Sequence, residues 1–203
     1  MKKTLTMVLA FALIFALGIG ATLAWLTATS GEVKNTFTTS DINITLTETF
    51  NKDTNGDGKN DAGEFKMIPG HTITKDPKVT VVADSEPCYL FVKVEKSSNF
   101  DSFMEYAIDS QWTPLTGVQG VDNVYYMVID SADKMGTPYS VLKNDQVKVL
   151  DGVTKTMMNG LTADNYPTLT FTAYASQLYK NNTATFTAAE AWANAQPTTT
   201  SGD

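Results

Sequence analysis

The segment Cys88-Tyr-Leu-Phe-Val-Lys-Val-Glu-Lys96 decides the fold. Successive side chains of an extended chain point to opposite faces, so Tyr89 and Phe91 share one face. Leu90 and Val92 share the other. Both faces are apolar in the first half of the segment, which is typical of a strand that is covered on both sides. We therefore expect 88–96 to be a central strand of a sheet.

Cys88 begins this strand and is the only cysteine of the chain, so no disulfide can form within one molecule. Reactive thiols need exposed, electropositive surroundings, whereas an apolar strand is a usual setting for a structural thiol. We expect Cys88 to be buried and inert.

Several other segments carry strand patterns. Residues 41–49 alternate, with Ile42, Ile44 and Leu46 on one face, as a half-buried strand requires. Thr, Val and Tyr dominate four more candidates, which are 79–83, 124–130, 146–150 and 168–176. Short strands separated by Gly, Pro and Asn/Asp loops predict an all-β fold, a jelly-roll-like antiparallel β-sandwich.

Helix signals are few and short. Residues 100–106 are expected to form a short helical turn. Thr187-Ala-Ala-Glu190 is a capping-box pattern, in which the threonine and glutamate side chains satisfy backbone groups at a helix start. It predicts a helix over 188–195 that carries Trp192.

The chain opens with the pattern of a secretory signal peptide. Lys2 and Lys3 precede an apolar run over residues 5–26, within which lies the small-residue pattern Thr22-x-Ala24. A positive start, an apolar middle and a small-x-small end are the parts of a cleavable leader. We expect cleavage between Ala24 and Trp25. A run of this length can also remain as a membrane anchor.

The rest of the chain divides into three regions by composition. Residues 25–39 form a Thr-rich, strand-capable arm that has no core-forming pattern. The sandwich domain is expected over 40–196, and 197–203 form a polar tail. With 1–24 as the signal peptide, the mature chain is long enough for one domain with a sizeable core.

The charge pattern narrows the class of partner. The 203-residue chain has a formal net charge of −7, and all 15 of its basic residues are lysine. Nucleic-acid binding needs a concentrated basic face, so this composition argues against it. An acidic surface suits solubility outside the cell and binding of cations.

Residues 53–64 fit the spacing of a calcium-binding loop. Calcium takes about six to eight hard oxygen ligands from a flexible loop, with glycine at the sharp turn, here Gly58. The expected ligands are Asp53, Asn55, Asp57, Lys59 (through its carbonyl), Asp61 and Glu64. The segments on either side of this loop are expected to be a strand and a loop and not two helices. This favours a structural Ca²⁺ site over a regulatory sensor. The alternative is a solvated acidic turn without metal.

No catalytic constellation is evident. His71 is the only histidine, so a zinc site with two histidines cannot form within one chain. The sequence has neither a His-Glu-x-x-His helix nor a Gly-x-Ser-x-Gly elbow. We expect that the protein is not an enzyme.

Several short segments together resemble the TasA/camelysin family. They are Ala21-Thr-Leu-Ala-Trp25, Gly31-Glu-Val-Lys-Asn-Thr-Phe37, Ile68-Pro-Gly-His-Thr72, Cys88-Tyr-Leu-Phe-Val-Lys-Val94 and Ala173-Tyr-Ala175. The resemblance covers most of the chain, and it rests on the order and spacing of the motifs, since each one is short.

The resemblance implies a secreted biofilm-matrix protein of a Gram-positive-type bacterium, with a leader that a SipW-type signal peptidase removes. It also implies a jelly roll that polymerises head to tail, because the freed arm of one subunit adds as a strand to the next. The arm is expected to anchor through Trp25, Leu26, Val33 and Phe37. Other matrix proteins are further candidate partners.

Three alternatives stay open beside the fibre hypothesis. The arm can be a disordered mature N-terminus. The protein can be a monomeric cell-surface module for calcium binding or adhesion. Camelysin members of the family have been described as metalloproteases, so a camelysin-like metallopeptidase is the third alternative, for which the sequence offers no conventional zinc ligand set.

Overall fold

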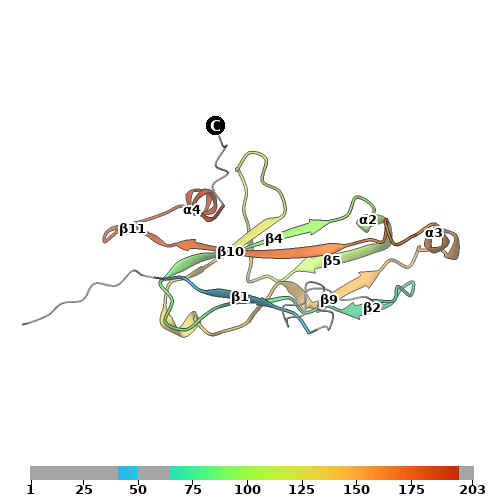
Figure 1. The fold of residues 1–203 in the computed structure, drawn as a ribbon, viewed down its shortest axis with the longest axis horizontal. Coiled ribbons are helices and arrows are strands. Elements are labelled where there is room, and N and C mark those ends of the chain that lie inside the picture. The colour runs from blue at the N-terminus through green and yellow to red at the C-terminus, as the bar shows by residue number, and fades with distance from the viewer. Residues whose placement is uncertain (1–40, 50–64, 197–203) are drawn as a thin grey trace, which may run out of the picture. The chain divides into compact units, whose positions relative to one another are not determined.

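The computed structural model describes residues 41–49 and 65–196, which form antiparallel sheets with a few short helices (Figure 1). In chain order the elements are β1 (Ile44–Thr47), β2 (Thr72–Thr74), β3 (Lys78–Val81), β4 (Cys88–Lys96), α2 (Phe100–Phe103), β5 (Met104–Ile108), β6 (Thr113–Pro114), β7 (Val124–Ile129), the 3₁₀ turn η1 (Ala132–Lys134), β8 (Tyr139–Ser140), β9 (Leu142–Val149), α3 (Lys155–Asn159), β10 (Leu169–Gln177), β11 (Tyr179–Asn181), β12 (Ala184–Thr185) and α4 (Ala188–Ala195). Every strand pair in it is antiparallel.

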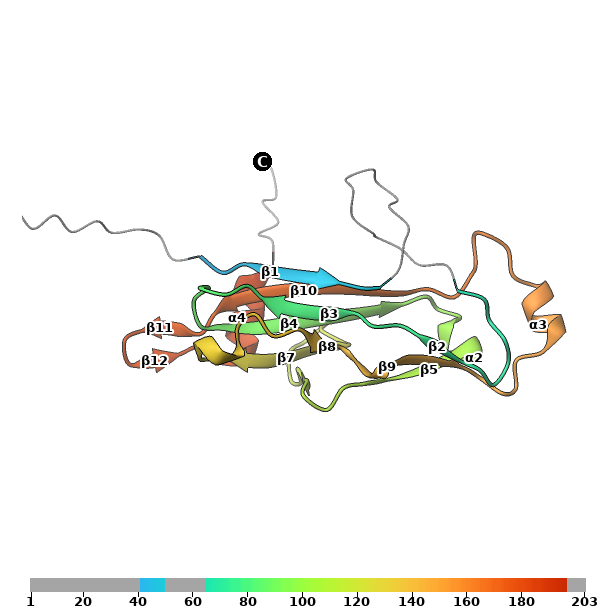
Figure 2. The same cartoon turned by 90° about the horizontal axis from the view of Figure 1, so that it is seen from below.

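The strands form two facing layers. One layer is the sheet β10-β4-β7-β6. The other consists of the sheets β1-β3-β8 and β2-β9-β5, which follow one another because only Val141 separates β8 from β9 and a short link joins β2 to β3 (Figure 2). A small hairpin, β11-β12, leads to α4. The expected all-β antiparallel sandwich is confirmed, and its jelly-roll winding stays a prediction.

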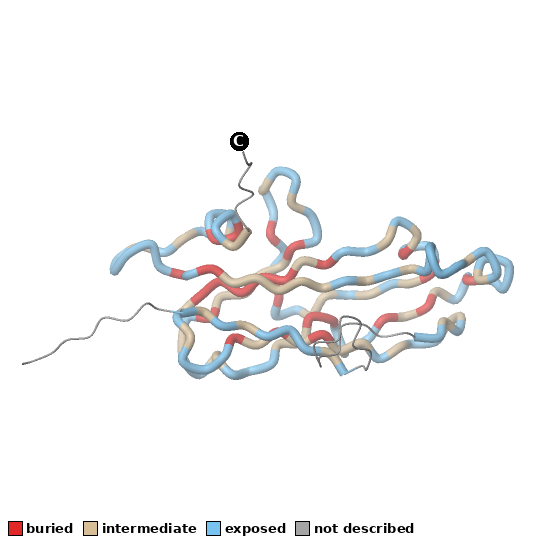
Figure 3. Tube along the Cα trace, in the orientation of Figure 1, coloured by how far each residue is buried: buried red, intermediate tan, exposed pale blue. Residues whose placement is uncertain are grey.

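Strand β4 is the centre of the core, as its two apolar faces predict. It pairs along its length with β10 on one edge and with β7 on the other. Leu90 and Val92 pack against Val79 and Val81 of β3, with Cys88 in the same cluster. The opposite face of β4 packs under α4, where the Phe91 ring meets Trp192 edge-on at 5.3 Å. Buried residues accordingly concentrate along β4 and its neighbours (Figure 3).

The helix predictions have mixed outcomes. The capping box at Thr187 and Glu190 is present, and α4 has the expected bounds. The prediction of a helix over 100–106 is correct only as far as Phe103. From Met104 the backbone is extended, with φ −142° and ψ 156°, because Met104 and Tyr106 turn onto the cluster of Leu142 and Val147 in β9.

The expected strands are present with small shifts in their bounds. Several other strands, most of them very short, were not predicted. β9 begins four residues before the predicted 146–150. β2, β6, β8, β11 and β12 have only two or three residues each, too few for a periodic pattern to be read, and β5 lies where a helical turn was expected. Ile42, just before β1, and Ile44 within it pack on the core as expected, whereas Leu46 is 38% exposed. Among the described residues, no helix is long and apolar enough to cross a membrane.

Candidate functional site

The outer edge of β10 carries the longest row of backbone N–H and C=O groups that face no other strand of the described residues. At the two ends of β10, Ser97 N donates to Thr168 O (3.0 Å) and Leu178 N donates to Pro87 O (2.9 Å). The backbone groups of even-numbered residues in β10 therefore face β4. The N–H and C=O groups of the odd-numbered residues face the other way. No strand of the described ranges pairs with β10 on that side.

This edge lacks the features that normally protect a sheet from adding foreign strands. Natural edge strands are short, charged, bulged or interrupted by proline. β10 has nine residues, Leu-Thr-Phe-Thr-Ala-Tyr-Ala-Ser-Gln, with no charge and no proline, and its register with β4 is continuous. By contrast, β6 is two residues long and contains Pro114. The edge strand β5 carries Glu105 and a register shift after Tyr106.

The edge of β10 faces a second open edge, that of β1. β1 pairs only with β3 in the described part of the chain, and it lies beside β10 (Figures 1 and 2). Apolar side chains from β10, from β1 and from the residues just before β1 pack partly buried on one core cluster; they are Ile42, Ile44, Phe171, Ala173 and Ala175. We call the line between these two strands the β1–β10 seam.

Leu46 shows that the seam is open to solvent. Its partner Val79 and the neighbouring Val81 are fully buried, and the register places Leu46 on the same inward face as Ile44. The 38% exposure of an inward-facing leucine indicates that no strand of the described residues covers the sandwich at this point. The side chains of Ala173 and Ala175 on the opposite strand are small and partly exposed.

A buried ion pair lies next to the seam. Lys75 Nζ lies 2.7 Å from Glu48 Oε1, and the two side chains are only 13% and 10% exposed. The same ammonium group lies 5.4 Å from the ring centroid of Phe171 in β10. Burial raises the pKa of Glu48 above its ordinary value, even though the hydrogen bond and charge of Lys75 act to lower it.

A neighbouring contact holds the end of β1 in place. Thr49 donates from its backbone N (3.0 Å) and from its hydroxyl (2.7 Å) to the Asp76 carboxylate. Burial acts to raise the pKa of Asp76, but these hydrogen bonds prevail and hold the pKa below its ordinary value. Together with Glu48 and Lys75, the contact fixes the chain just before residue 50 to the link between β2 and β3.

The residues singled out in the sequence for metal binding, cleavage and strand donation lie outside the described residues. They are Asp53, Asn55, Asp57, Lys59, Asp61 and Glu64 for calcium, Ala24 and Trp25 for cleavage, and Trp25, Leu26, Val33 and Phe37 for the arm. Within residues 41–49 and 65–196, no group of three or more His, Cys, Asp or Glu side chains is placed to hold a metal ion.

Cys88 has the inert setting that its sequence context predicts. Its side chain is fully buried, and burial raises the pKa of the thiol to about 11. The thiolate is the nucleophilic form of cysteine, so a thiol with this pKa is protonated and unreactive at neutral pH. His71, in contrast, is exposed.

The sequence pattern predicts the strand at 168–176, but it does not show that this strand lies at the edge of its sheet. Whether a strand is central or at an edge depends on partners that are distant in the chain, and only the pairing pattern reveals it. The signal that was available is the absence of charge and proline over nine residues. No family model, no curated protein and no solved structure matches this chain.

Proposed function

We propose that the protein is a secreted structural subunit that assembles into extracellular biofilm-matrix fibres by donating its N-terminal arm, residues 25–39, to the β1–β10 seam of the next subunit. The observation that carries this proposal is the nine-residue, uncharged outer edge of β10, which no strand of residues 41–49 and 65–196 pairs with. The leader-like pattern of residues 1–24 and the family resemblance support the extracellular setting.

Strand addition suits this edge on physical grounds. An extended peptide that pairs with a free edge satisfies a row of backbone N–H and C=O groups, and its alternate side chains fill adjacent pockets. The apolar surface available to such side chains here is the partly exposed lining of the seam, with Leu46 on one strand and Ala173 and Ala175 on the other. Bulky anchors such as Trp25, Val33 and Phe37 complement these small residues.

The mode of contact favours a fibre over a closed dimer. The arm and the seam are different surfaces, so donation from one subunit to the next is a heterologous contact, and such contacts extend into filaments unless the rotation closes a ring. Partners would be further copies of the same chain, with a SipW-type peptidase acting during export. Ca²⁺ bound by residues 53–64 would shape the loop that follows β1.

The first prediction compares assembly of the chain beginning at Trp25 with that of a form lacking residues 25–38. Electron microscopy is expected to show fibres for the first form and none for the second. The proline variant Ala173→Pro, in the complete form, removes one N–H from the outer edge of β10 while leaving the pairing with β4 intact, so it is expected to block fibres without unfolding the domain.

Ala132→Pro is the matched control. Ala132 is the first residue of the turn η1 and follows Ser131, which is extended, so proline fits there. This variant is expected to assemble like the wild type. The proposal fails if the mature form stays monomeric under all secretion-like conditions, or if the truncated form or Ala173→Pro makes the same fibres.

A further inference from the structure

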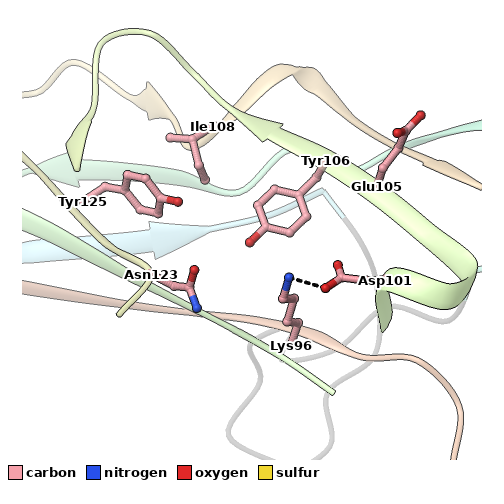
Figure 4. A pocket seen from close by; sticks show the side chains of 7 residues that line it. All are labelled: Lys96, Asp101, Glu105, Tyr106, Ile108, Asn123 and Tyr125. Atoms are coloured by element: carbon pink, nitrogen blue, oxygen red, sulfur yellow. Dashed lines mark hydrogen bonds and ion pairs between the residues drawn. The ribbon is translucent and has the colours of Figure 1, made fainter. Parts of the chain in front are cut away.

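A polar cleft of about 400 Å³ opens between β5 and the β4–β7 pair, at a different place from the β1–β10 seam (Figure 4). Its main lining residues are Lys96, Asp101, Tyr106, Ile108, Asn123 and Tyr125. They come from four segments: the end of β4, α2, β5 and the start of β7. We call it the Tyr106–Tyr125 cleft. Its volume falls within the range of small-molecule sites, about 300–1,000 Å³.

Several polar groups converge in this cleft, and two of them, both tyrosine hydroxyls, are available to bond a ligand. Figure 4 shows the hydroxyls of Tyr106 and Tyr125, the carboxamide of Asn123 and the ammonium of Lys96 directed toward one space. Within the described residues, neither tyrosine hydroxyl makes a hydrogen bond to the protein. Tyr89 and Tyr139 differ, because their hydroxyls donate to backbone carbonyls at 2.9 and 2.8 Å.

Contacts within the protein hold the lining groups in place. The ring of Tyr106 packs edge-on against Phe100, with centroids 5.8 Å apart. Asn123 has a left-handed backbone, φ 55°, and its carbonyl accepts a hydrogen bond from Val94 N at 2.9 Å. Lys96 Nζ lies 2.6 Å from the Asp101 carboxylate. A site that is ordered before binding loses less entropy when a ligand enters.

The charges of the cleft argue against an anionic ligand. Lys96 is the one basic residue of its lining as described, and it is paired with Asp101 at 2.6 Å. Glu105, a second carboxylate of the lining, lies 3.7 Å from Lys148, which pairs more closely with Asp151 at 3.0 Å. The described lining therefore has no unpaired basic group to hold an anion, and Lys96 compensates one of its two carboxylates. The lining is too polar for a purely apolar ligand.

The hydroxyl, carboxamide and apolar groups of the cleft match the groups of a sugar. Adjacent sugar hydroxyls each donate and accept, and phenol hydroxyls and a carboxamide do the same. Ile108 and the tyrosine rings supply apolar surface for the C–H face of a pyranose. We propose that the Tyr106–Tyr125 cleft binds hexose units of a neutral saccharide. The cleft is open to solvent, so a unit within a longer chain can enter as well as a free sugar.

The test is a titration of the ¹⁵N-labelled full chain with neutral hexasaccharides, namely cellohexaose, maltohexaose and the N-acetylglucosamine hexamer. Amide signals of Tyr106, Asn123 and Tyr125 are expected to shift with at least one of them. Tighter binding of a hexasaccharide than of glucose, galactose or N-acetylglucosamine identifies a polysaccharide as the source. Equal binding per hexose unit identifies a free sugar.

The double variant Tyr106→Phe/Tyr125→Phe keeps both rings and removes both hydroxyls, and is expected to weaken binding about tenfold or more. Tyr166→Phe is the matched control, since Tyr166 is 55% exposed and lies outside the cleft, and it should bind as the wild type does.

Three results would overturn the assignment: no hexasaccharide of the panel shifts the cleft amides, the double variant binds as tightly as wild type, or a charged hyaluronan hexasaccharide binds better than every neutral one. The titration is run on the monomeric protein, because a fibre tumbles too slowly for its amide signals to be resolved. Each result therefore bears on the cleft and not on donation of the arm.

Discussion

At the scale of single residues, the Glu48–Lys75 pair shows most clearly how the cost of burying charges competes with the attraction between them. The two groups lie 2.7 Å apart in a largely buried setting. Desolvation of both charges offsets the attraction between them, and the raised pKa of Glu48 shows that desolvation prevails for the carboxylate. The pair fixes the end of β1 beside Phe171 and so defines one end of the seam.

The pH dependence follows from the direction of this shift. A raised pKa means that the folded state binds more protons than the unfolded state in the window that starts at the ordinary value, 4.5, and extends above it. The contribution of Glu48 to stability is therefore complete below that window. It decreases as the pH rises through it.

The second prediction is that Lys75→Met destabilises the domain by about 3 kcal/mol at neutral pH, because it leaves a buried carboxylate without its cation. The loss should shrink below pH 4.5, where Glu48 is protonated in both states, and Glu48→Gln in the same background should restore stability. Urea unfolding between pH 4 and 7 measures both. Lys134→Met, which breaks an exposed pair, is the control. A loss that does not depend on pH would contradict this explanation.

At the scale of elements, α4 is a short helix whose start is fixed by its own side chains. Thr187 Oγ1 accepts from Glu190 N (3.3 Å), and Glu190 Oε2 accepts from Thr187 N (2.8 Å). Lys180 of the β11–β12 hairpin adds a 2.6 Å ion pair to the same carboxylate. This geometry places Trp192 over Phe91 and Tyr174, so a local signal positions the cover of the core.

The third prediction concerns acid stability. The pKa of Glu190 is lowered to about 2. The hydrogen bond from Lys180 is the largest cause, and the hydrogen bonds from Thr187 come next. A lowered pKa stabilises the fold above the ordinary value of 4.5, and this stabilisation is lost as the pH falls toward 2. Glu190→Gln should therefore lie below wild type in melting temperature at pH 7 and converge with it near pH 2.

Glu86→Gln serves as the control for the acid series, because Glu86 is an exposed carboxylate outside α4. Parallel curves for Glu190→Gln and wild type over the whole pH range would contradict the assigned role of the carboxylate. Thermal unfolding followed by circular dichroism distinguishes the two outcomes.

Elements with local signals were predictable from the sequence, and elements that depend on distant partners were not. The two apolar faces of β4 and the capping box of α4 are encoded within a few neighbouring residues. The local pattern predicted helix as far as Tyr106, but residues 104–108 form β5. They do so because pairing with β9, which lies some forty residues later in the chain, prevails over local preference. The free edge of β10 and the Tyr106–Tyr125 cleft depend entirely on such long-range pairing.

At the scale of the whole molecule, the long uncharged edge of β10 distinguishes the β1–β10 seam from the other edges of the two facing layers in the described residues, which belong to β2, β5, β6 and β8. An unpaired, uncharged nine-residue edge is a hazard for a protein that must stay monomeric, because it pairs readily with other chains. In a fibre subunit the same edge is the acceptor. The proposed order of events is export, cleavage between Ala24 and Trp25, and donation of the freed arm.

The fourth prediction addresses the calcium loop. Isothermal titration with Ca²⁺ should give a measurable heat for the chain beginning at Trp25 and none for Asp57→Ala, because Asp57 is an expected ligand. Binding to the folded state should also raise the melting temperature of the wild type. Asp122→Ala, an exposed change outside the loop, should behave as wild type. Equal heats for Asp57→Ala and wild type would remove the site from the proposal.

Amide hydrogen exchange along β10, in monomers and in fibres, tests the central claim most directly. Thr172 and Tyr174 face β4, so their amides should be protected in both states. Phe171, Ala173 and Ala175 face the open edge, so their amides should exchange rapidly in the monomer and become protected in the fibre. Rapid exchange of these three amides in fibres would contradict donation of a strand to β10.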